Sequence, residues 1–120
     1  MKYMAMIYHD EKAAATATPE QLQALFGNFM KFTAEVTASG QYQAGAPLQP
    51  STTGTTVRVA QGKAVTTDGP FAETKEQLAG YYIFDCKDLD EAIELGGRIC
   101  KLYTYPGSVV EIRPVRQMPS

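Results

Sequence analysis

Residues 68–75 read DGPFAETK, and this stretch decides the fold because it joins a predicted β-hairpin to a predicted central strand. Pro70 fixes its own φ angle and pushes Gly69 toward extended geometry, so the pair sets a turn. Phe71 is expected to anchor the connection in the hydrophobic core. The charged residues of the stretch are then left free for polar roles.

The segments around this stretch predict strands of two kinds. Ala79–Cys86 and Lys2–Tyr8 are apolar at both odd and even positions, which is typical of strands buried on both faces. Thr55–Val59 and Lys63–Thr66 flank Gln61-Gly62, where the glycine supplies the positive φ of a tight hairpin turn. Shorter strands are predicted near Gln41–Ala44 and at Val109–Arg113.

Two helices are predicted from their start signals. Thr18 is the N-cap of the first, with Pro19 at the first helical position and Gln21 completing a capping box. Apolar residues follow at three- and four-residue spacing until Gly40. The three phenylalanines of this stripe are interpreted as core residues: Phe26, Phe29 and Phe32. A second capping box at Asp88 starts a helix that runs to about Tyr103.

The order strand, helix, strands, strand, helix, strand predicts an α+β fold, a ferredoxin-like sandwich with an added β-hairpin. Two helices cover only one face of the antiparallel sheet, so the apolar side chains of the other face need a partner surface. A symmetric homodimer with its sheets face to face, a dimeric α/β-barrel, meets that need.

Length and composition favour one domain over residues 1–120 in a cytoplasmic protein. The chain has 120 residues, 44% of them hydrophobic, and a formal net charge of −2. This charge disfavours direct nucleic-acid binding, and no apolar run approaches the roughly 20 residues that span a bilayer. Cys86 and Cys100 are interpreted as small buried hydrophobes, and the single histidine offers no metal-ligand spacing. We therefore expect no metal, no cofactor and no membrane association.

Several motifs together closely resemble YCII-related proteins of the DGPF type. The resemblance rests on the N-terminal Met1–Met4, on Ile7–Glu11, on the run from Asp68 to Tyr82, on Leu89–Ala92 and on Val110–Pro114. It implies a dimeric ferredoxin-like barrel in a bacterial cytoplasm and an association with extracytoplasmic-function sigma factors. It does not imply a substrate.

Candidate site residues come from the first strand and from the DGPFAETK stretch. His9 is the only histidine, so acid–base chemistry near neutral pH by an unperturbed side chain depends on it, with Asp10 and Asp68 as further candidate catalytic groups. Candidate ligand-binding residues are Asp68, Phe71, Glu73, Lys75 and Tyr81. The alternative is that Asp68 caps the turn while Glu73 and Lys75 form an exposed ion pair of little energetic value.

Three classes of function follow. The first is a binding or regulatory protein that engages a sigma factor, and the sequence places it slightly ahead of the others. The second is a cofactor-free small-molecule enzyme in which His9 works with Asp10, Asp68 or Glu73. The third is a structural dimer without a ligand, which predicts a solid interior and no cleft beside Phe71.

Overall fold

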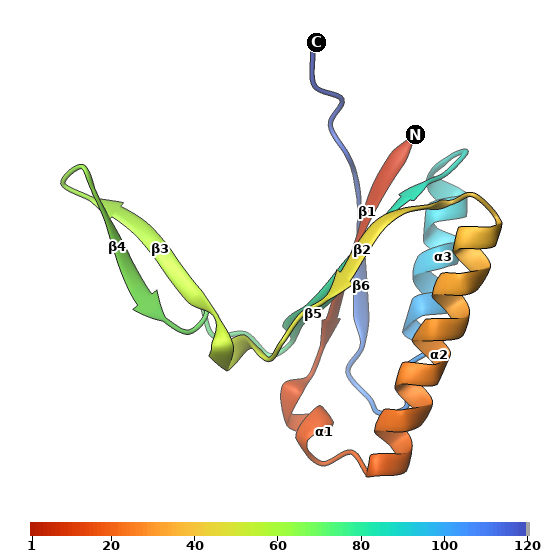
Figure 1. Ribbon diagram of the computed structural model, residues 1–120, viewed down its shortest axis with the longest axis horizontal. Coiled ribbons are helices and arrows are strands. Elements are labelled where there is room, and N and C mark those ends of the chain that lie inside the picture. Colours follow the sequence, from red (N-terminus) through yellow and green to blue (C-terminus); the bar gives the residue numbers. More distant parts are fainter. Residues whose placement is uncertain (120) are drawn as a thin grey trace.

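The computed structural model describes residues 1–119, which form a four-stranded antiparallel sheet with two helices on one face and a separate hairpin (Figure 1). The sheet order is β2-β5-β1-β6, with strands β1 (Lys2–His9), β2 (Tyr42–Pro47), β5 (Gln77–Asp85) and β6 (Val109–Pro114). The helices α2 (Pro19–Ala38) and α3 (Leu89–Cys100) connect β1 to β2 and β5 to β6. Without the hairpin this is the predicted ferredoxin-like arrangement.

The helix starts confirm the local predictions in most respects. Thr18 accepts a hydrogen bond from the Gln21 backbone N–H, and the Gln21 side chain accepts one from the Thr18 backbone, which completes the capping box of α2. Asp88 caps α3 in the same way through the Glu91 backbone N–H. The second capping box is incomplete, because the Glu91 carboxylate accepts from the Lys87 backbone and from the Gln41 side chain instead.

The core lies between the sheet and the two helices. Tyr3, Ala5 and Ile7 alternate along β1 and are buried against the helices, as are Tyr82 and Phe84 on β5. Side chains of a strand point alternately to its two faces, so the residues between them lie on the opposite, helix-free face of the sheet.

Two predicted core residues are exposed. Phe32 is 2% exposed and lies in the core, but Phe26 is 67% exposed on the same helix. A helical period identifies a broad apolar stripe and does not tell which of its residues meet a neighbour. Phe71 is 79% exposed, so the prediction that it anchors residues 68–75 in the core is wrong.

A short helix and a 3-10 turn were not predicted from the sequence, whereas the hairpin was. A short helix, α1 (Glu11–Ala15), follows β1, with Asp10 as its N-cap, and a 3-10 turn, η1 (Ser51–Thr53), precedes the hairpin. The hairpin consists of β3 (Thr55–Ala60) and β4 (Lys63–Asp68), joined through Gln61 and Gly62, which both have positive φ. Of the two cysteines, Cys86 is buried and Cys100 is half-buried.

Candidate functional site

A large hollow lies between α2 and the sheet, and we call it the α2 cavity. Its volume is about 590 Å³, within the range of small-molecule sites. Six segments contribute: the end of β1, α1, α2 from Leu22 to Thr33, β2, β5 and the segment after α3. Its lining residues are Ile7, His9, Ala14, Leu22, Leu25, Phe26, Phe29, Met30, Thr33, Tyr42, Gly45, Ala46, Pro47, Leu48, Ala79, Gly80, Tyr81, Tyr82, Tyr103 and Tyr105.

His9 is the titratable group that the α2 cavity presents near neutral pH. It follows Tyr3, Ala5 and Ile7 in the alternation of β1, which directs it to the helix side of the sheet. Its Nδ1 lies 2.8 Å from the Tyr105 Oη, in a hydrogen bond whose direction depends on the imidazole tautomer. Burial lowers the pKa of His9 from its usual value, although Glu11 and Asp10 act in the opposite direction. His9 is therefore mainly neutral at pH 7.

Three tyrosines of the cavity keep their protons at neutral pH. Burial raises the pKa of Tyr103, Tyr105 and Tyr82 above the ordinary tyrosine value. The Tyr82 Oη is 2.6 Å from the Thr33 Oγ1, so this hydroxyl is already partnered. These three tyrosines therefore supply neutral hydroxyls and aromatic faces rather than charge.

The segment after α3 positions Tyr103 and Tyr105. The Thr104 hydroxyl donates to the Gln21 carbonyl at 2.7 Å, which ties this segment to the first turn of α2. The Tyr103 ring packs edge-on against Phe29, with centroids 5.6 Å apart, and edge-on against Tyr105 at 5.5 Å. Tyr103 and Tyr105 thus form one wall of the cavity beside His9.

The α1 segment closes the same end of the cavity. The Glu11 backbone N–H donates to the Gln77 side chain at 2.9 Å. The Glu11 carboxylate accepts from both the backbone N–H and the hydroxyl of Ser51, at 2.7 and 2.5 Å. This acid is therefore committed to holding η1 against α1, and Ala14 of α1 lines the cavity.

The structure brings together only part of the predicted site. His9 and Tyr81 line the α2 cavity. Asp10 accepts from the Lys12 backbone N–H as the cap of α1. Asp68 ends the exposed strand β4, and the three remaining candidates lie exposed beyond it and do not line the cavity: Phe71, Glu73 and Lys75. Their part in a site stays a prediction.

The sequence reasoning missed Tyr103 and Tyr105, whose ring centroids lie 6.1 and 6.0 Å from that of His9. The available signal was a pair of tyrosines in Tyr103-Thr104-Tyr105, between the end of the predicted helix and the Pro106-Gly107 break. Aromatic residues in a connection follow no helical or strand period that would explain their burial. A pair of them there indicates packing against distant parts of the fold. His9 and Tyr105 are 96 residues apart in the sequence, so no pattern among neighbouring residues predicts their contact.

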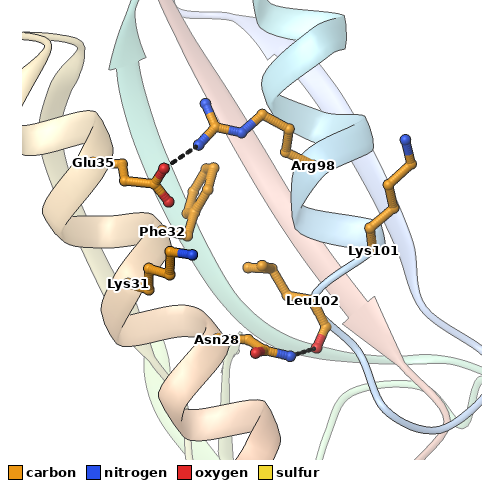
Figure 2. Close-up of a pocket in the computed structure, with 7 residues that line it drawn as sticks. All are labelled: Asn28, Lys31, Phe32, Glu35, Arg98, Lys101 and Leu102. Carbon is orange, nitrogen blue, oxygen red and sulfur yellow. Dashed lines mark hydrogen bonds and ion pairs between the residues drawn. The ribbon is translucent and has the colours of Figure 1, made fainter.

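A second hollow lies between α2 and α3 and serves a structural role (Figure 2). The Arg98 guanidinium lies 4.9 Å from the centre of the Phe32 ring and 3.7 Å from the Glu35 carboxylate. The Asn28 side chain donates to the Leu102 carbonyl at 2.9 Å. Figure 2 shows Arg98 and Glu35 bridging α3 and α2, and Asn28 reaching the segment after α3, so these groups are already engaged in holding α2 in place.

Residues 1–119 contain neither a cluster of metal-ligating side chains nor a membrane-spanning helix. Within this range, no three histidine, cysteine, aspartate or glutamate side chains gather closely enough to hold a metal ion. None of the helices described is both long enough and apolar enough to cross a membrane.

Comparison with known proteins identifies relatives over nearly the whole chain. The family model of the YCII-related domain matches residues 1–119. An uncharacterised protein of Rhizobium meliloti (strain 1021) is 33% identical over 115 residues, which cover 96% of this chain and 92% of the relative. A solved structure of 5-chloro-2-hydroxyhydroquinone dehydrochlorinase from Burkholderia phenoliruptrix, in complex with 2,5-dihydroxybenzoquinone, is similar with a TM-score of 0.42 and 18% identity, covering 92% of this chain and 91% of that one. So distant a likeness leaves the function to be argued from the residues of this chain.

Proposed function

The chain belongs to the family of YCII-related domains, and from that premise we propose that it binds a small, uncharged, mainly apolar molecule in the α2 cavity and exchanges a proton with it through His9. One observation carries the proposal. His9 and its hydrogen-bonded partner Tyr105 both line a cavity whose described lining includes no Asp, Glu, Lys or Arg. A cavity of this kind argues against the solid interior of a purely structural dimer.

The lining defines the class of molecule. A carboxylate or phosphate in the α2 cavity would lose its water without gaining a cationic partner, which is costly for a charged group. An uncharged ring could instead pack on the faces and edges of Phe29, Tyr103 and Tyr105. A hydroxyl or carbonyl on such a ring would find hydrogen-bond partners in His9 and Tyr105.

The chemistry follows from the protonation states. His9 is neutral and Tyr105 keeps its proton, because burial lowers the pKa of the first and raises that of the second. When the Nδ1–H of His9 donates to the Tyr105 Oη, the lone pair of Nε2 is available to accept a proton from a bound molecule. Tyr105 then orients the imidazole, the role that a carboxylate has in many acid–base pairs.

The carboxylates expected to assist His9 are committed elsewhere or lie outside the cavity. Asp10 caps α1, and Asp68 and Glu73 do not belong to the cavity lining. The proposal therefore keeps His9 from the sequence-based enzyme hypothesis and replaces its carboxylate partners with Tyr105.

Binding is tested by NMR, because the only histidine gives an imidazole signal that needs no assignment. Phenol is the probe and benzoate, a charged ring of similar size, is its matched control. We expect phenol to shift the His9 Cε1–H resonance saturably and benzoate to leave it unchanged. Equal shifts with both probes, or no shift with phenol, would contradict the proposed cavity chemistry.

Proton transfer is tested with 5-nitrobenzisoxazole, an uncharged aromatic probe. A base removes its ring C–H proton, the ring N–O bond breaks, and a coloured cyanonitrophenolate forms. We expect the rate to rise with pH through the His9 pKa and to be lost in His9→Gln. Asp68→Asn, outside the cavity, should retain the wild-type rate. An unchanged rate in His9→Gln would refute proton transfer by this residue.

Two copies of the chain are proposed to associate through the helix-free face of the sheet. Met4 is paired with Ile83 and Met6 with Tyr81 in the β1–β5 register, and directly opposed residues share a face. All four side chains are half-buried without a covering layer. The sigma-factor association stays a prediction of the family resemblance, and co-purification from cells that express the native operon would test it.

A further inference from the structure

The β3–β4 hairpin, Thr55–Asp68, forms an arm that stands apart from the body of the protein. It is a separate two-stranded sheet and lies on the side of the main sheet opposite α2 and α3 (Figure 1). The radius of gyration is 16.2 Å, whereas a compact domain of this length has about 13.6 Å. At its foot the Gly69 N–H donates to the Gly54 carbonyl at 2.7 Å, and the Thr56 hydroxyl donates to the Gly69 carbonyl at 2.8 Å.

The two faces of the arm differ in chemistry. Val57 pairs with Thr66 and Val59 with Ala64, so these four residues share one face, and the only charge on that face is Asp68, opposite Thr55 at the foot of the arm. Arg58 and Lys63 lie on the opposite face. Val57 is 61% exposed and Val59 is 76% exposed. The arm is therefore amphipathic, and its apolar face is open to water in the single chain.

An uncovered arm of this kind needs a partner to be stable. A two-stranded hairpin is marginal at best in water unless another layer covers it. All residues of the arm are exposed except Thr56, which is half-buried, so the body of the same chain does not supply that layer.

We propose that the apolar face of each arm packs on a second copy of this chain, so that the two arms clasp the dimer. This inference rests on the proposed association of the helix-free faces. The arm projects on the side of that face, so a copy seated there meets the arm as well. In a two-fold symmetric dimer this contact occurs twice, because each chain supplies one arm and one surface on which the partner's arm packs. The partner thus covers both apolar surfaces that the fold leaves open.

The wild-type chain and four variants test the clasp by sedimentation velocity over a range of concentrations. Val57→Thr combined with Val59→Thr removes apolar contact and keeps β-branched side chains in the strand. Val65→Thr is the matched control on the charged face of the arm. A deletion of Thr55–Asp68 joins Gly54 to Gly69, whose backbones are already hydrogen-bonded, and removes no buried core residue. Met6→Lys disrupts the helix-free face without touching the arm.

We expect a wild-type dimer whose dissociation constant rises by about 10-fold or more in the double valine variant and in the deletion, while Val65→Thr behaves as wild type. A dimer weakened by Met6→Lys but unchanged in both arm variants would overturn the clasp and leave the sheet-face association standing. A wild-type monomer at all concentrations would overturn both. No arm residue lines the α2 cavity, so the phenol experiment stays independent of either result.

Discussion

Replacing Gly80 by alanine tests how closely β2 and β5 must approach to form the floor of the α2 cavity. Gly80 is buried, pairs with Ile7 on one side and with Pro47 on the other, and lines the cavity. A Cβ at this position would lie 2.8 Å from the Ala46 carbonyl oxygen and 3.2 Å from the Pro47 Cα. Both neighbours are backbone atoms, so β2 must move away, which weakens the bond from the Leu48 N–H to the Ala79 carbonyl, 2.8 Å long in the wild type.

The magnitude follows from two opposing effects. Overpacking of this kind costs about 1–3 kcal/mol, and the loss of glycine's freedom in the unfolded chain returns about 0.4–1 kcal/mol. The net destabilisation is about 1–2 kcal/mol. An unfolding entropy of about 2.1 cal/mol/K per residue amounts to about 0.25 kcal/mol/K for 120 residues. We therefore expect the melting temperature of Gly80→Ala to fall by about 4–8 °C.

The assay is thermal unfolding followed by circular dichroism, with Gly97→Ala as control. A Cβ at Gly97 would meet no atom within 4 Å on the exposed side of α3. Alanine in a helix gains about 0.5–1 kcal/mol over glycine, so this variant should melt about 2–4 °C higher. A Gly80→Ala protein that melts within about 1 °C of wild type, while Gly97→Ala rises as expected, would refute the close approach of β2 and β5.

Three further predictions concern His9 and the aromatic residues. The unfolded chain binds a proton at His9 near its usual pKa of 6.5, whereas the folded chain binds it only at lower pH, so the free energy of unfolding should fall as pH drops from 6.5 through the lowered pKa. Urea unfolding of wild type and His9→Gln at several pH values checks this. The same dependence of unfolding free energy on pH in both proteins would contradict it. Phe84→Ala should cost about 3–5 kcal/mol because Phe84 is 0% exposed, whereas Phe71→Ala should stay within about 0.5 kcal/mol; comparable losses in urea unfolding would show that Phe71 is covered. Gly107→Ala should lower stability by about 1–3 kcal/mol, because Gly107 has φ +102° and a Cβ there would lie 2.8 Å from the Asp10 Cβ. The same change should shift the NMR resonance of His9, the neighbour of Asp10. An unchanged His9 signal would show that this turn does not position the His9–Tyr105 pair.

Most of the architecture was accessible from local sequence. Capping at Thr18, the turn at Gln61-Gly62 and the apolar runs of β1 and β5 are properties of neighbouring residues, and the structure confirms each of them. The errors have a common cause. Phe26 and Phe71 are apolar residues in sequence contexts typical of core positions. Burial also requires a second surface that covers the side chain, and both side chains are exposed in this chain.

The candidate site was only partly predictable for the same reason. His9 could be singled out by its chemistry and by its place at the end of a strand. Its partner Tyr105 is 96 residues away, and Asp10, its neighbour in sequence, turns out to cap a helix. Proximity along the chain is a poor guide to the partner of a side chain that leaves a sheet, because the adjacent residue points to the other face.

The sequence by itself determined the family, the order of the elements and the identity of the one histidine, since these depend on motifs, periods and residue types. Only the tertiary structure decided that residues 68–75 lie outside the α2 cavity, that two tyrosines from a distant connection stand beside His9, and that the hairpin projects as an arm. The physical reason is that a cavity and an uncovered face are properties of the space between elements. The packing distances between helices and strands determine that space, and a pattern among neighbouring residues does not predict those distances.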